Sequence, residues 1–266
     1  MIRLIVNADD FGWDENRTKA ILEAYRRGII TTATAMANMP WFEKAVEMAR
    51  GTDFFHNIGL HLCLTEGFPL TETIRHSRLF CRDDGSFHGR FHVSYFRRMI
   101  LPSFECRAVA EEAEAQMTRY IESGLPLMHL DSHHHSHTDS SIARIVLPIA
   151  KRLGFRSIRL SRNLGSGLTI MKRLYKWRIN RFMGKVVPFN ADYFGAFADL
   201  VSSGDRLPDG TTVEIMTHPL YRDASTGELS MFGTFMDYKS PIDVMAEFWK
   251  QNRDVFQLTG MSKIKE

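Results

Sequence analysis

Carboxylate and imidazole side chains stand at four separate places along this chain of 266 residues. Asp9 and Asp10 are adjacent in the segment NADDFG, His61 lies in GLHLCLTEG, four histidines follow Asp131 in HLDSHHHSH, and His218 lies in EIMTHP. Two imidazoles and one carboxylate suffice to hold a divalent metal ion, and further groups of these types can accept and donate protons. The residue types indicate metal-assisted hydrolysis if the fold brings them together.

The acidic pair Asp9 and Asp10 directly follows an apolar run, residues 2–6. Two carboxylates buried side by side repel each other and lose their hydration, so a cation is expected beside them. Because this stretch offers no Lys or Arg, we expect a divalent metal bound by one carboxylate, with the other left free as a base. The alternative is that the pair caps the next helix, a duty that Asp14 can share.

The segment HLDSHHHSH, residues 129–137, holds five imidazoles within nine positions. Such a density indicates metal or proton chemistry. Since one ion cannot take all five, the roles of His134, His135 and His137 stay open. A surface histidine cluster is the alternative, and the position between a predicted strand and a predicted helix makes it less favoured.

The sequence lacks the motifs of several other common classes of enzyme. No GxGxxG follows a strand and no Walker sequence is present, so a nucleotide cofactor is not expected, and GxSxG is missing as well. The chain has three cysteines and no CxxC pair, which argues against a disulfide framework. Cys63 is two positions after His61 and is expected to be a small buried residue rather than a nucleophile.

The elements that must position these residues alternate between strand and helix. Amphipathic helices are predicted before Gly28, after Pro40 and from Val109 to Ile121. A last helix is predicted to begin with a cap at Ser240. Val244 and Phe248 are expected to form the buried face of that last helix. Strands are predicted at residues 2–8, 31–38, 57–64, 127–130, 156–160 and 212–218.

Alternating strands and helices predict a parallel α/β sheet, open or closed into a barrel. The carboxyl ends of parallel strands meet on one face, which would gather the separated acidic and histidine residues into one pocket. Residues 65–90 are expected to form a long loop on that face. We find no repeat or linker, so residues 1–266 are predicted to form a single domain.

Residues 161–190 are the least regular part of the chain and are rich in Lys and Arg. They are hypothesised to be an inserted helical lid, with a solvated basic helix face as the alternative.

Composition limits the partners. The net charge is +3, too small to indicate a nucleic acid. No apolar run reaches the length of a membrane span, so no stable membrane insertion is expected. The absence of a leader pattern predicts the cytoplasm. A homodimer is expected only because twofold assemblies are common.

The segments NADDFG, GLHLCLTEG, HLDSHHHSH and EIMTHP, in this order and spacing, resemble the YdjC/ChbG family of carbohydrate deacetylases, including its HpnK-type members. The four motifs extend from Asn7 to Pro219. The resemblance implies a deformed (β/α) barrel of the polysaccharide-deacetylase-like type and one divalent metal ion, Mg or Zn. It also implies removal of an N-acetyl group from an amino sugar in an oligosaccharide or glycolipid.

Carried over position by position, the resemblance implies that Asp10, His61 and His133 hold the metal. Asp9 would then be the general base and His218 the general acid, although the sequence itself does not separate the roles of Asp9 and Asp10.

This chain departs from the family pattern at Trp13, where an aliphatic residue is usual, and in residues 161–190, which the motifs do not cover. Because of these two departures, the resemblance does not identify the sugar substrate. Trp13, Trp41 and Phe68 are either core residues or stacking surfaces for a sugar. The competing functions are a metal-dependent phosphoesterase and a non-catalytic glycan-binding protein that retains the metal site.

Overall fold

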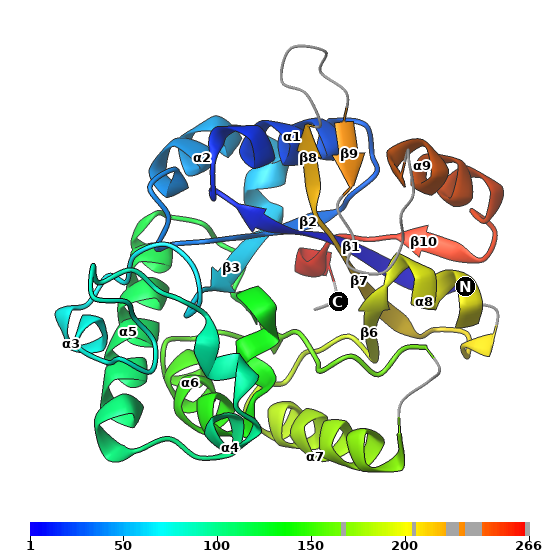
Figure 1. Ribbon diagram of the computed structural model, residues 1–266. Coiled ribbons are helices and arrows are strands. Elements are labelled where there is room, and N and C mark those ends of the chain that lie inside the picture. The colour runs from blue at the N-terminus through cyan, green and yellow to red at the C-terminus, as the bar shows by residue number, and fades with distance from the viewer. Residues whose placement is uncertain (166–168, 204–205, 222–228, 232–240, 264–266) are drawn as a thin grey trace.

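A parallel sheet of eight strands forms the centre of the computed structural model, which describes residues 1–165, 169–203, 206–221, 229–231 and 241–263 (Figure 1). The strand order is β5-β4-β3-β2-β1-β7-β6, and β10 also pairs with β1. The strands are β1 (Ile2–Phe11), β2 (Thr32–Ala35), β3 (Ile58–Leu62), β4 (His129–Ser132), β5 (Ser157–Ile158), β6 (Tyr193–Ala196), β7 (Thr212–Thr217) and β10 (Phe256–Leu258).

Helices surround the curled sheet in Figure 1. The longer ones are α1 (Glu15–Arg26), α2 (Phe42–Ala49), α5 (Ser103–Glu122), α6 (Ser140–Arg152), α7 (Ile170–Val186), α8 (Phe197–Ser203) and α9 (Pro241–Gln251). Shorter elements are α3 (Glu72–Arg75), α4 (Tyr95–Met99), the 3₁₀ helix η3 (His133–Thr138) and the hairpin of β8 (Pro219–Tyr221) and β9 (Leu229–Met231).

The curl of the sheet brings its two edge strands towards each other. The backbone N–H groups of Asn163 and Leu164, which follow β5, donate to the carbonyl oxygen of Phe194 in β6 at 3.1 and 3.0 Å. These bonds bridge the two edges without forming a regular strand pair. The predicted α/β fold, a deformed barrel in a single domain, is confirmed.

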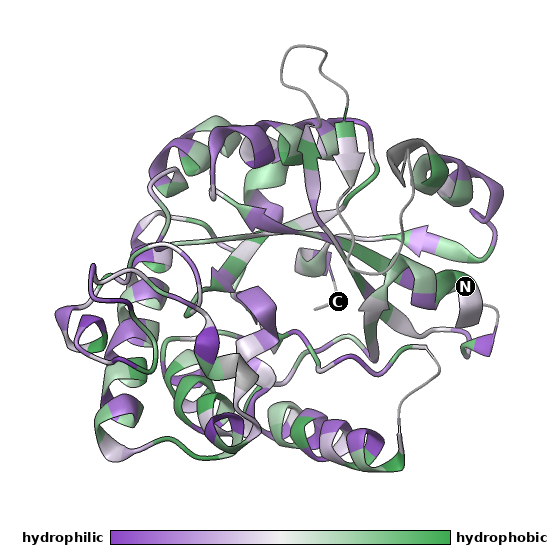
Figure 2. Cartoon of the chain, in the orientation of Figure 1, coloured by the Kyte–Doolittle hydropathy of each residue, from purple (hydrophilic) through white to green (hydrophobic). Residues whose placement is uncertain are grey.

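The sheet has an apolar outer face and a polar interior. Strand β1 is buried along almost its whole length, as expected for a strand paired on both sides. Figure 2 shows the green, hydrophobic parts of the helices alternating with purple turns, as amphipathic helices packed on a sheet do. Buried polar residues recur at alternate strand positions and face the interior: Asn7, Asp9, His61, His129, Asp131 and Glu214.

One residue is wrong in each of two predicted helix faces. In α5, Tyr120 is buried and its hydroxyl donates to the carbonyl oxygen of Ile58 at 2.8 Å, whereas Ile121 is exposed. In α9, the predicted Val244 is exposed and the predicted Phe248 packs half-buried against the core, while Trp249 is buried and its indole N–H donates to the Ile29 carbonyl oxygen at 3.2 Å. In both helices an aromatic side chain with a polar group reaches a backbone partner, and this contact sets the buried face.

Met245, four positions before Trp249, completes the buried face of α9. The predicted cap at Ser240 lies outside the described residues. The predicted loop at residues 65–90 contains the short helix α3 and an isolated bridge between Cys81 and Phe87. No helix in the described part of the chain is both long and apolar enough to cross a membrane.

Candidate metal and catalytic site

The acidic pair lies in an irregularity of β1. The register of β1 against β2 shifts between Ala8 and Phe11, and Asp10 has a φ of 69°, in the left-handed region. In a regular strand Asp9 and Asp10 would point to opposite faces of the sheet. The bulge lets both carboxylates face the interior, so one strand supplies two neighbouring acids to one site.

Asp10, His61 and His133 converge on one point. Asp10 Oδ1 is 3.0 Å from His133 Nδ1 and 3.4 Å from His61 Nε2, and the two ring nitrogens are 3.4 Å apart. Around an ion with bonds of about 2.1 Å, ligand atoms stand about 3.0 Å apart at right angles and about 3.4 Å apart in a tetrahedron. The three atoms therefore already have the spacing of a metal site.

The chemistry of these donors fits a cation as well. Asp10 Oδ1 is buried and has no hydrogen bond of acceptable geometry among the described residues. Burial raises the pKa of Asp10, but the imidazoles of His133 and His61 outweigh burial and hold the pKa well below its usual range. An ionised carboxylate with an unsatisfied buried oxygen is the group that a divalent metal would complete.

Asp131 orients His61. The Asp131 carboxylate lies 2.6 Å from His61 Nδ1 and also accepts a hydrogen bond from the Thr34 hydroxyl at 3.0 Å. When Nε2 gives up its proton to bind a metal, the proton kept on Nδ1 would leave the Nε2 lone pair directed at the point between Asp10 and His133. Burial lowers the pKa of His61, but Asp131, Asp10 and Asp9 outweigh burial and raise the pKa to about 10.

Asp9 is held by Arg159, a residue that the sequence did not single out. Arg159 Nη1 and Nη2 donate to the two oxygens of Asp9 at 2.8 and 2.7 Å, and Asn7 Nδ2 donates to Asp9 Oδ1 at 2.9 Å. The sequence around the acidic pair has no Lys or Arg, and the expectation drawn from this is that the protein offers it no cation. That expectation is wrong, because the fold brings Arg159 into contact with Asp9. The structure pairs Asp9 with the guanidinium, which leaves Asp10 for a metal.

Arg159 binds two further carboxylates in the same buried interior. Its Nη1 is 2.7 Å from Asp131 Oδ2, and its Nε donates to Glu214 Oε1 at 2.6 Å. The guanidinium carbon lies 4.8 Å from the centre of the Phe194 ring. Burial raises the pKa of Glu214 to about 7, whereas Arg159 outweighs burial at Asp9 and keeps its pKa below the usual value.

His218 lies on the open side of the acidic pair. It follows β7 directly, and its Nε2 is 3.7 Å from Asp9 Oδ2. Its side chain is 24% exposed, compared with 3% for Asp9. A ring at this place can exchange protons with solvent while it faces Asp9.

The histidine tract divides into different environments. His137 is buried, with Nδ1 2.5 Å from the Ser132 hydroxyl and Nε2 2.9 Å from the carbonyl oxygen of Arg159. Burial lowers its pKa to about 4, so the ring is neutral at pH 7. It fixes the backbone that carries Arg159. His129 is also buried, with Nδ1 2.9 Å from the Ser157 hydroxyl.

His134 and His135 adopt left-handed backbone conformations, with φ of 52° and 55°. Together with Asp10 they are the non-glycine residues of positive φ in the described chain. All three lie at or beside the candidate metal site, where backbone strain accompanies positioning. His134 is exposed, and the His135 ring packs edge-to-face on Phe194 at 5.5 Å.

Trp13 and Cys63 flank this region. The Trp13 ring packs edge-to-face on His133 at 5.1 Å, so the position that departs from the family pattern contacts a candidate ligand.

Cys63 is buried, and burial raises the pKa of its thiol to about 12, which leaves no thiolate for nucleophilic attack at neutral pH. The cap of α1 is Asp14, whose carboxylate accepts from the backbone N–H of Arg17 at 2.8 Å, so the acidic pair does not serve as that cap.

Sequence comparison gives matches over most of the chain. The model of the family described as YdjC-like protein matches residues 3–255. A protein of Brevibacillus brevis named carbohydrate deacetylase is 33% identical over 225 residues, covering 84% of this chain and 83% of the relative. A protein of Geobacillus stearothermophilus with the same name is 32% identical over 227 residues, covering 82% of this chain and 80% of the relative.

Structural comparison gives a match of the whole fold. A crystal structure from Enterococcus faecalis V583 superimposes with a TM-score of 0.71 and covers 97% of both chains. The name of that protein assigns it, as a candidate, to cellobiose-phosphate cleavage. Since the two sequences are 23% identical, this likeness concerns the fold alone.

Proposed function

This chain belongs to the YdjC-like protein family, and on that premise we propose that it is a metal-dependent carbohydrate deacetylase. It removes the N-acetyl group from an amino sugar in an oligosaccharide or glycolipid. The reaction class is supported by relatives named carbohydrate deacetylase that share about a third of their residues with this chain. The family predicted from the four sequence motifs is confirmed.

The observation that carries the proposal is the arrangement of five side chains. Asp10, His61 and His133 present three ligand atoms separated by 3.0 to 3.4 Å. Asp9 and His218 lie beside them, 3.7 Å apart. A metal site next to an acid–imidazole pair is what hydrolysis of an amide requires.

The protein's own residues would divide the proton transfers between them. Asp9 is kept ionised by Arg159, so it can accept the proton of an attacking water. His218, on the open side, would donate a proton to the departing amine, without which an amide cannot break. A bound metal would supply Lewis-acid polarisation of the acetyl carbonyl.

One divalent ion, Mg or Zn, is proposed for the site. The observed separations include both the value for ligands at right angles, as Mg prefers, and the value for a tetrahedral Zn site. Two imidazoles favour Zn by affinity, and the family resemblance favours Mg.

The phosphoesterase alternative is weakened by Arg159. Two-metal phosphoesterases need a second ion about 4 Å from the first. The neighbouring carboxylates that would hold it, Asp131 and Glu214, are already bound by the guanidinium. The guanidinium of Arg159 already supplies positive charge beside these carboxylates, which weighs against a second metal ion there.

Acetate release from N-acetylated mono-, di- and oligosaccharides and from glycolipids tests the proposed function. We expect acetate from at least one of them and about one divalent ion per chain. Asp10→Ala and His61→Ala should lose the ion, and Asp9→Asn should keep it while turnover falls on the order of a hundredfold or more. Phosphate release from sugar phosphates without any acetate would favour the phosphoesterase. Metal binding without either activity would favour a glycan-binding protein.

The remaining sequence expectations stay predictions. They are a cytoplasmic location, no nucleic-acid partner, a homodimer, and a lid at residues 161–190. Helix α7, Ile170–Val186, lies within that last segment.

A further inference from the structure

Helix α7 carries apolar side chains on the face that points to solvent. Ile170 is 83% and Trp177 56% exposed, and Leu174 between them is exposed as well. At about 100° per residue these three fall within about 60° of one another, and the buried Ile179 lies about 180° from Ile170. The exposed apolar stripe therefore lies on the side of α7 opposite its packed face. A usual surface helix carries polar residues on that side.

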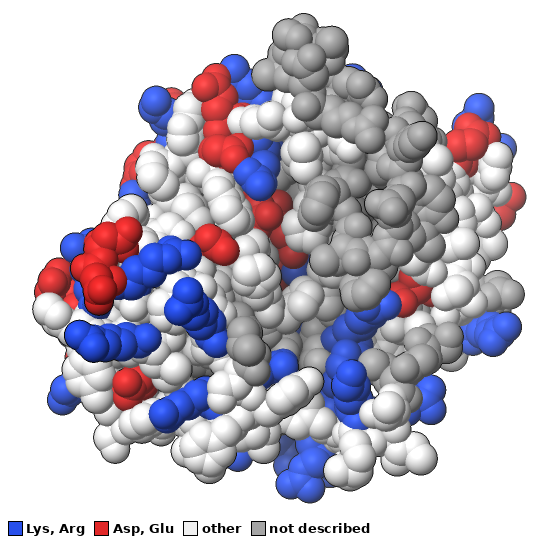
Figure 3. Space-filling model, viewed as in Figure 1, with Lys and Arg blue, Asp and Glu red and all other residues white. Residues whose placement is uncertain are grey.

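The charge of α7 is entirely positive. Its sequence, IMKRLYKWRINRFMGKV, has no Asp or Glu. Figure 3 shows white and blue atoms over α7 at the lower edge of the molecule. The cations are Lys172, Arg173, Lys176, Arg178, Arg181 and Lys185.

Helix α4 adds a second apolar and basic segment beside α7. Tyr95 is 77% and Phe96 64% exposed, and Arg97 and Arg98 follow them. Ser140 joins the two helices: its hydroxyl donates to the carbonyl oxygen of Met99 at 3.5 Å, and its backbone N–H donates to the Tyr175 hydroxyl at 3.1 Å. We call the exposed residues of the two helices, together with Ile100 directly after α4, the α4–α7 surface; its apolar members are Tyr95, Phe96, Met99, Ile100, Ile170, Met171, Leu174 and Trp177.

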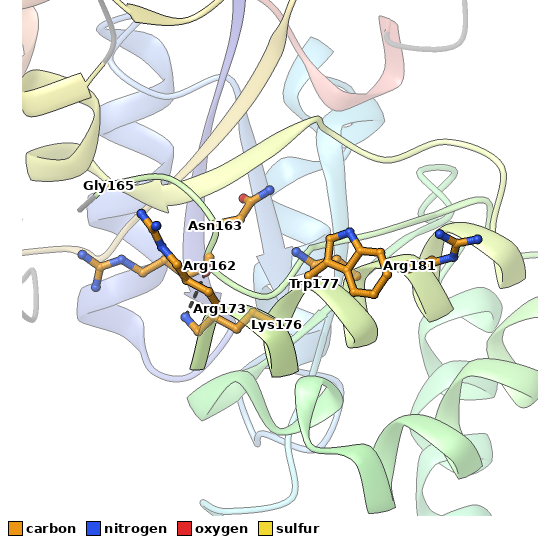
Figure 4. Close-up of a pocket in the computed structure, with 8 residues that line it drawn as sticks. Arg162, Asn163, Gly165, Arg173, Lys176, Trp177 and Arg181 are labelled. Atoms are coloured by element: carbon orange, nitrogen blue, oxygen red, sulfur yellow. Dashed lines mark hydrogen bonds between the residues drawn. The ribbon is translucent and has the colours of Figure 1, made fainter. Parts of the chain in front are cut away.

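A cavity of about 300 Å³ opens between α7 and the chain after β5. Figure 4 shows Arg162 and Lys176 at one end of it and Trp177 with Arg181 at the other. Its walls are fixed, since the amide of Asn180 exchanges hydrogen bonds with the backbone N–H and C=O of Ser161 at 2.8 and 2.9 Å. Arg162 is paired with Asp199, and Lys176 Nζ donates to the Arg162 carbonyl oxygen at 2.9 Å, so Arg173 and Arg181 are the cations of the lining that would bind a phosphate group attached to a larger molecule.

From these features we propose that the α4–α7 surface docks on a lipid bilayer with anionic headgroups, and that the basic cavity accepts a headgroup phosphate. Exposed Ile, Leu, Met and aromatic side chains suit the boundary between headgroups and acyl chains, and the surrounding Lys and Arg suit anionic lipid. A second copy of the chain is disfavoured, because a twofold contact would place the cations of α7 against each other. A nucleic acid would leave the apolar stripe without a partner.

Docking in this way would orient the candidate site. The α4–α7 surface is attached to Ser140, the first residue of α6, which directly follows η3 and its His133. The carboxyl ends of the strands would thus lie near the lipid. The docking itself is independent of the proposed deacetylation and is peripheral, without a membrane span.

Sedimentation with vesicles tests the proposal on the full chain. We expect binding to vesicles of phosphatidylcholine with phosphatidylglycerol, weak binding to phosphatidylcholine alone, and weaker binding at higher salt. The variant Ile170→Ser/Leu174→Ser/Trp177→Ser should lose affinity by tenfold or more. Arg173→Gln/Arg181→Gln should lose about fivefold per cation.

Matched changes elsewhere on the surface serve as controls. Met48→Ser/Ile121→Ser removes exposed apolar residues from α2 and α5, and Lys151→Gln/Lys250→Gln removes exposed cations from α6 and α9; both should bind vesicles like the wild type. Circular dichroism and acetate release in solution verify that each variant is folded. No binding of the wild type to anionic vesicles, undiminished binding of the triple serine variant, or a stable dimer that buries α7 would overturn the proposal. Free inorganic phosphate and anionic vesicles are also compared by how far each raises the midpoint of thermal unfolding. Equal increases would show that the cavity binds soluble phosphate and would refute the docking.

Discussion

Arg159 joins the catalytic and the metal-holding halves of the candidate site. A single buried guanidinium contacts Asp9, which faces the proposed water, and Asp131, which orients His61. Its planar, forked donors suit three carboxylates at once, which a lysine ammonium could not match. Loss of this one side chain would leave Asp9, Asp131 and Glu214 buried without the cation that they share.

Replacing Arg159 tests this role. We expect Arg159→Met to lower the free energy of unfolding by about 3–5 kcal/mol, because it leaves buried carboxylates unpaired. Urea unfolding measures the change. The control Arg119→Met removes an exposed pair with Glu43 and should cost at most about 1 kcal/mol. A loss at Arg159 no larger than at Arg119 would contradict the assignment.

Variants of Asp131 and Glu214 can distinguish two roles of the buried carboxylates. One role is to orient the candidate ligand His61, and the other is to balance the charge of Arg159. Both contact Arg159, but only Asp131 contacts His61. We expect Asp131→Asn to weaken metal binding by about 10–100-fold, because the ring loses its charged acceptor. Glu214→Gln is the matched control and should leave the affinity nearly unchanged. Competition with a metal-binding dye measures both, and equal losses would remove Asp131 from this role.

At the residue scale the sequence predicted which side chains converge but not how the charges balance. Residue types and strand-end positions indicated the acidic pair, His61 and the histidine tract, and the family resemblance then implied Asp10, His61 and His133 as the metal ligands. Arg159 was missed because its partner Asp9 is 150 residues away in the chain. Its place in RSIRL, alternating with Ile158 and Leu160, was the available signal for an inward polar side chain.

At the scale of elements, short irregularities position the site. The bulge in β1 turns Asp10 inward, and η3 begins with His133 and continues through two left-handed residues, His134 and His135. Neither irregularity follows from hydrophobic periodicity, which predicts regular strands and helices. This is also why the parallel sheet and most of its helices were predicted better than the local geometry at the site.

The left-handed backbone of His134 gives a test at this scale. Glycine adopts positive φ without cost, so His134→Gly should leave the free energy of unfolding unchanged or raise it by up to about 1 kcal/mol. His134→Val should lower it by more than about 1 kcal/mol. His76 is exposed with a φ of −81°, and His76→Gly should instead be destabilising. The same loss for glycine at both positions, measured by urea unfolding, would argue against strain at His134.

At the scale of the whole molecule, the buried ionisable groups link stability to pH. Glu214, with its pKa raised to about 7 by burial, stabilises the fold fully below its ordinary pKa of 4.5, and this contribution is lost as pH rises through 7. His129 and His137, with pKa values lowered by burial to about 3 and about 4, act in the opposite sense. Their contribution is lost as pH falls below the ordinary histidine value of 6.5.

Glu214→Gln removes one of these opposing contributions. Between pH 5 and 6 the slope of the unfolding free energy against pH should become more positive by about 1.4 kcal/mol per pH unit, the value for one proton. Urea unfolding of both proteins at several pH values, in the presence of a chelator, measures the two slopes. Identical slopes would mean that Glu214 is ionised in the folded protein.

The pairing of β1 has a consequence for how the molecule is made. Its residues Asn7 and Ile2 pair with Met216 of β7 and Phe256 of β10, so β1 leaves the ribosome long before the neighbours with which it pairs. Contacts of such long range slow folding, and an apolar strand that waits for them is prone to aggregate. We therefore expect slow refolding from denaturant and a nascent chain that depends on chaperones until β7 and β10 have emerged.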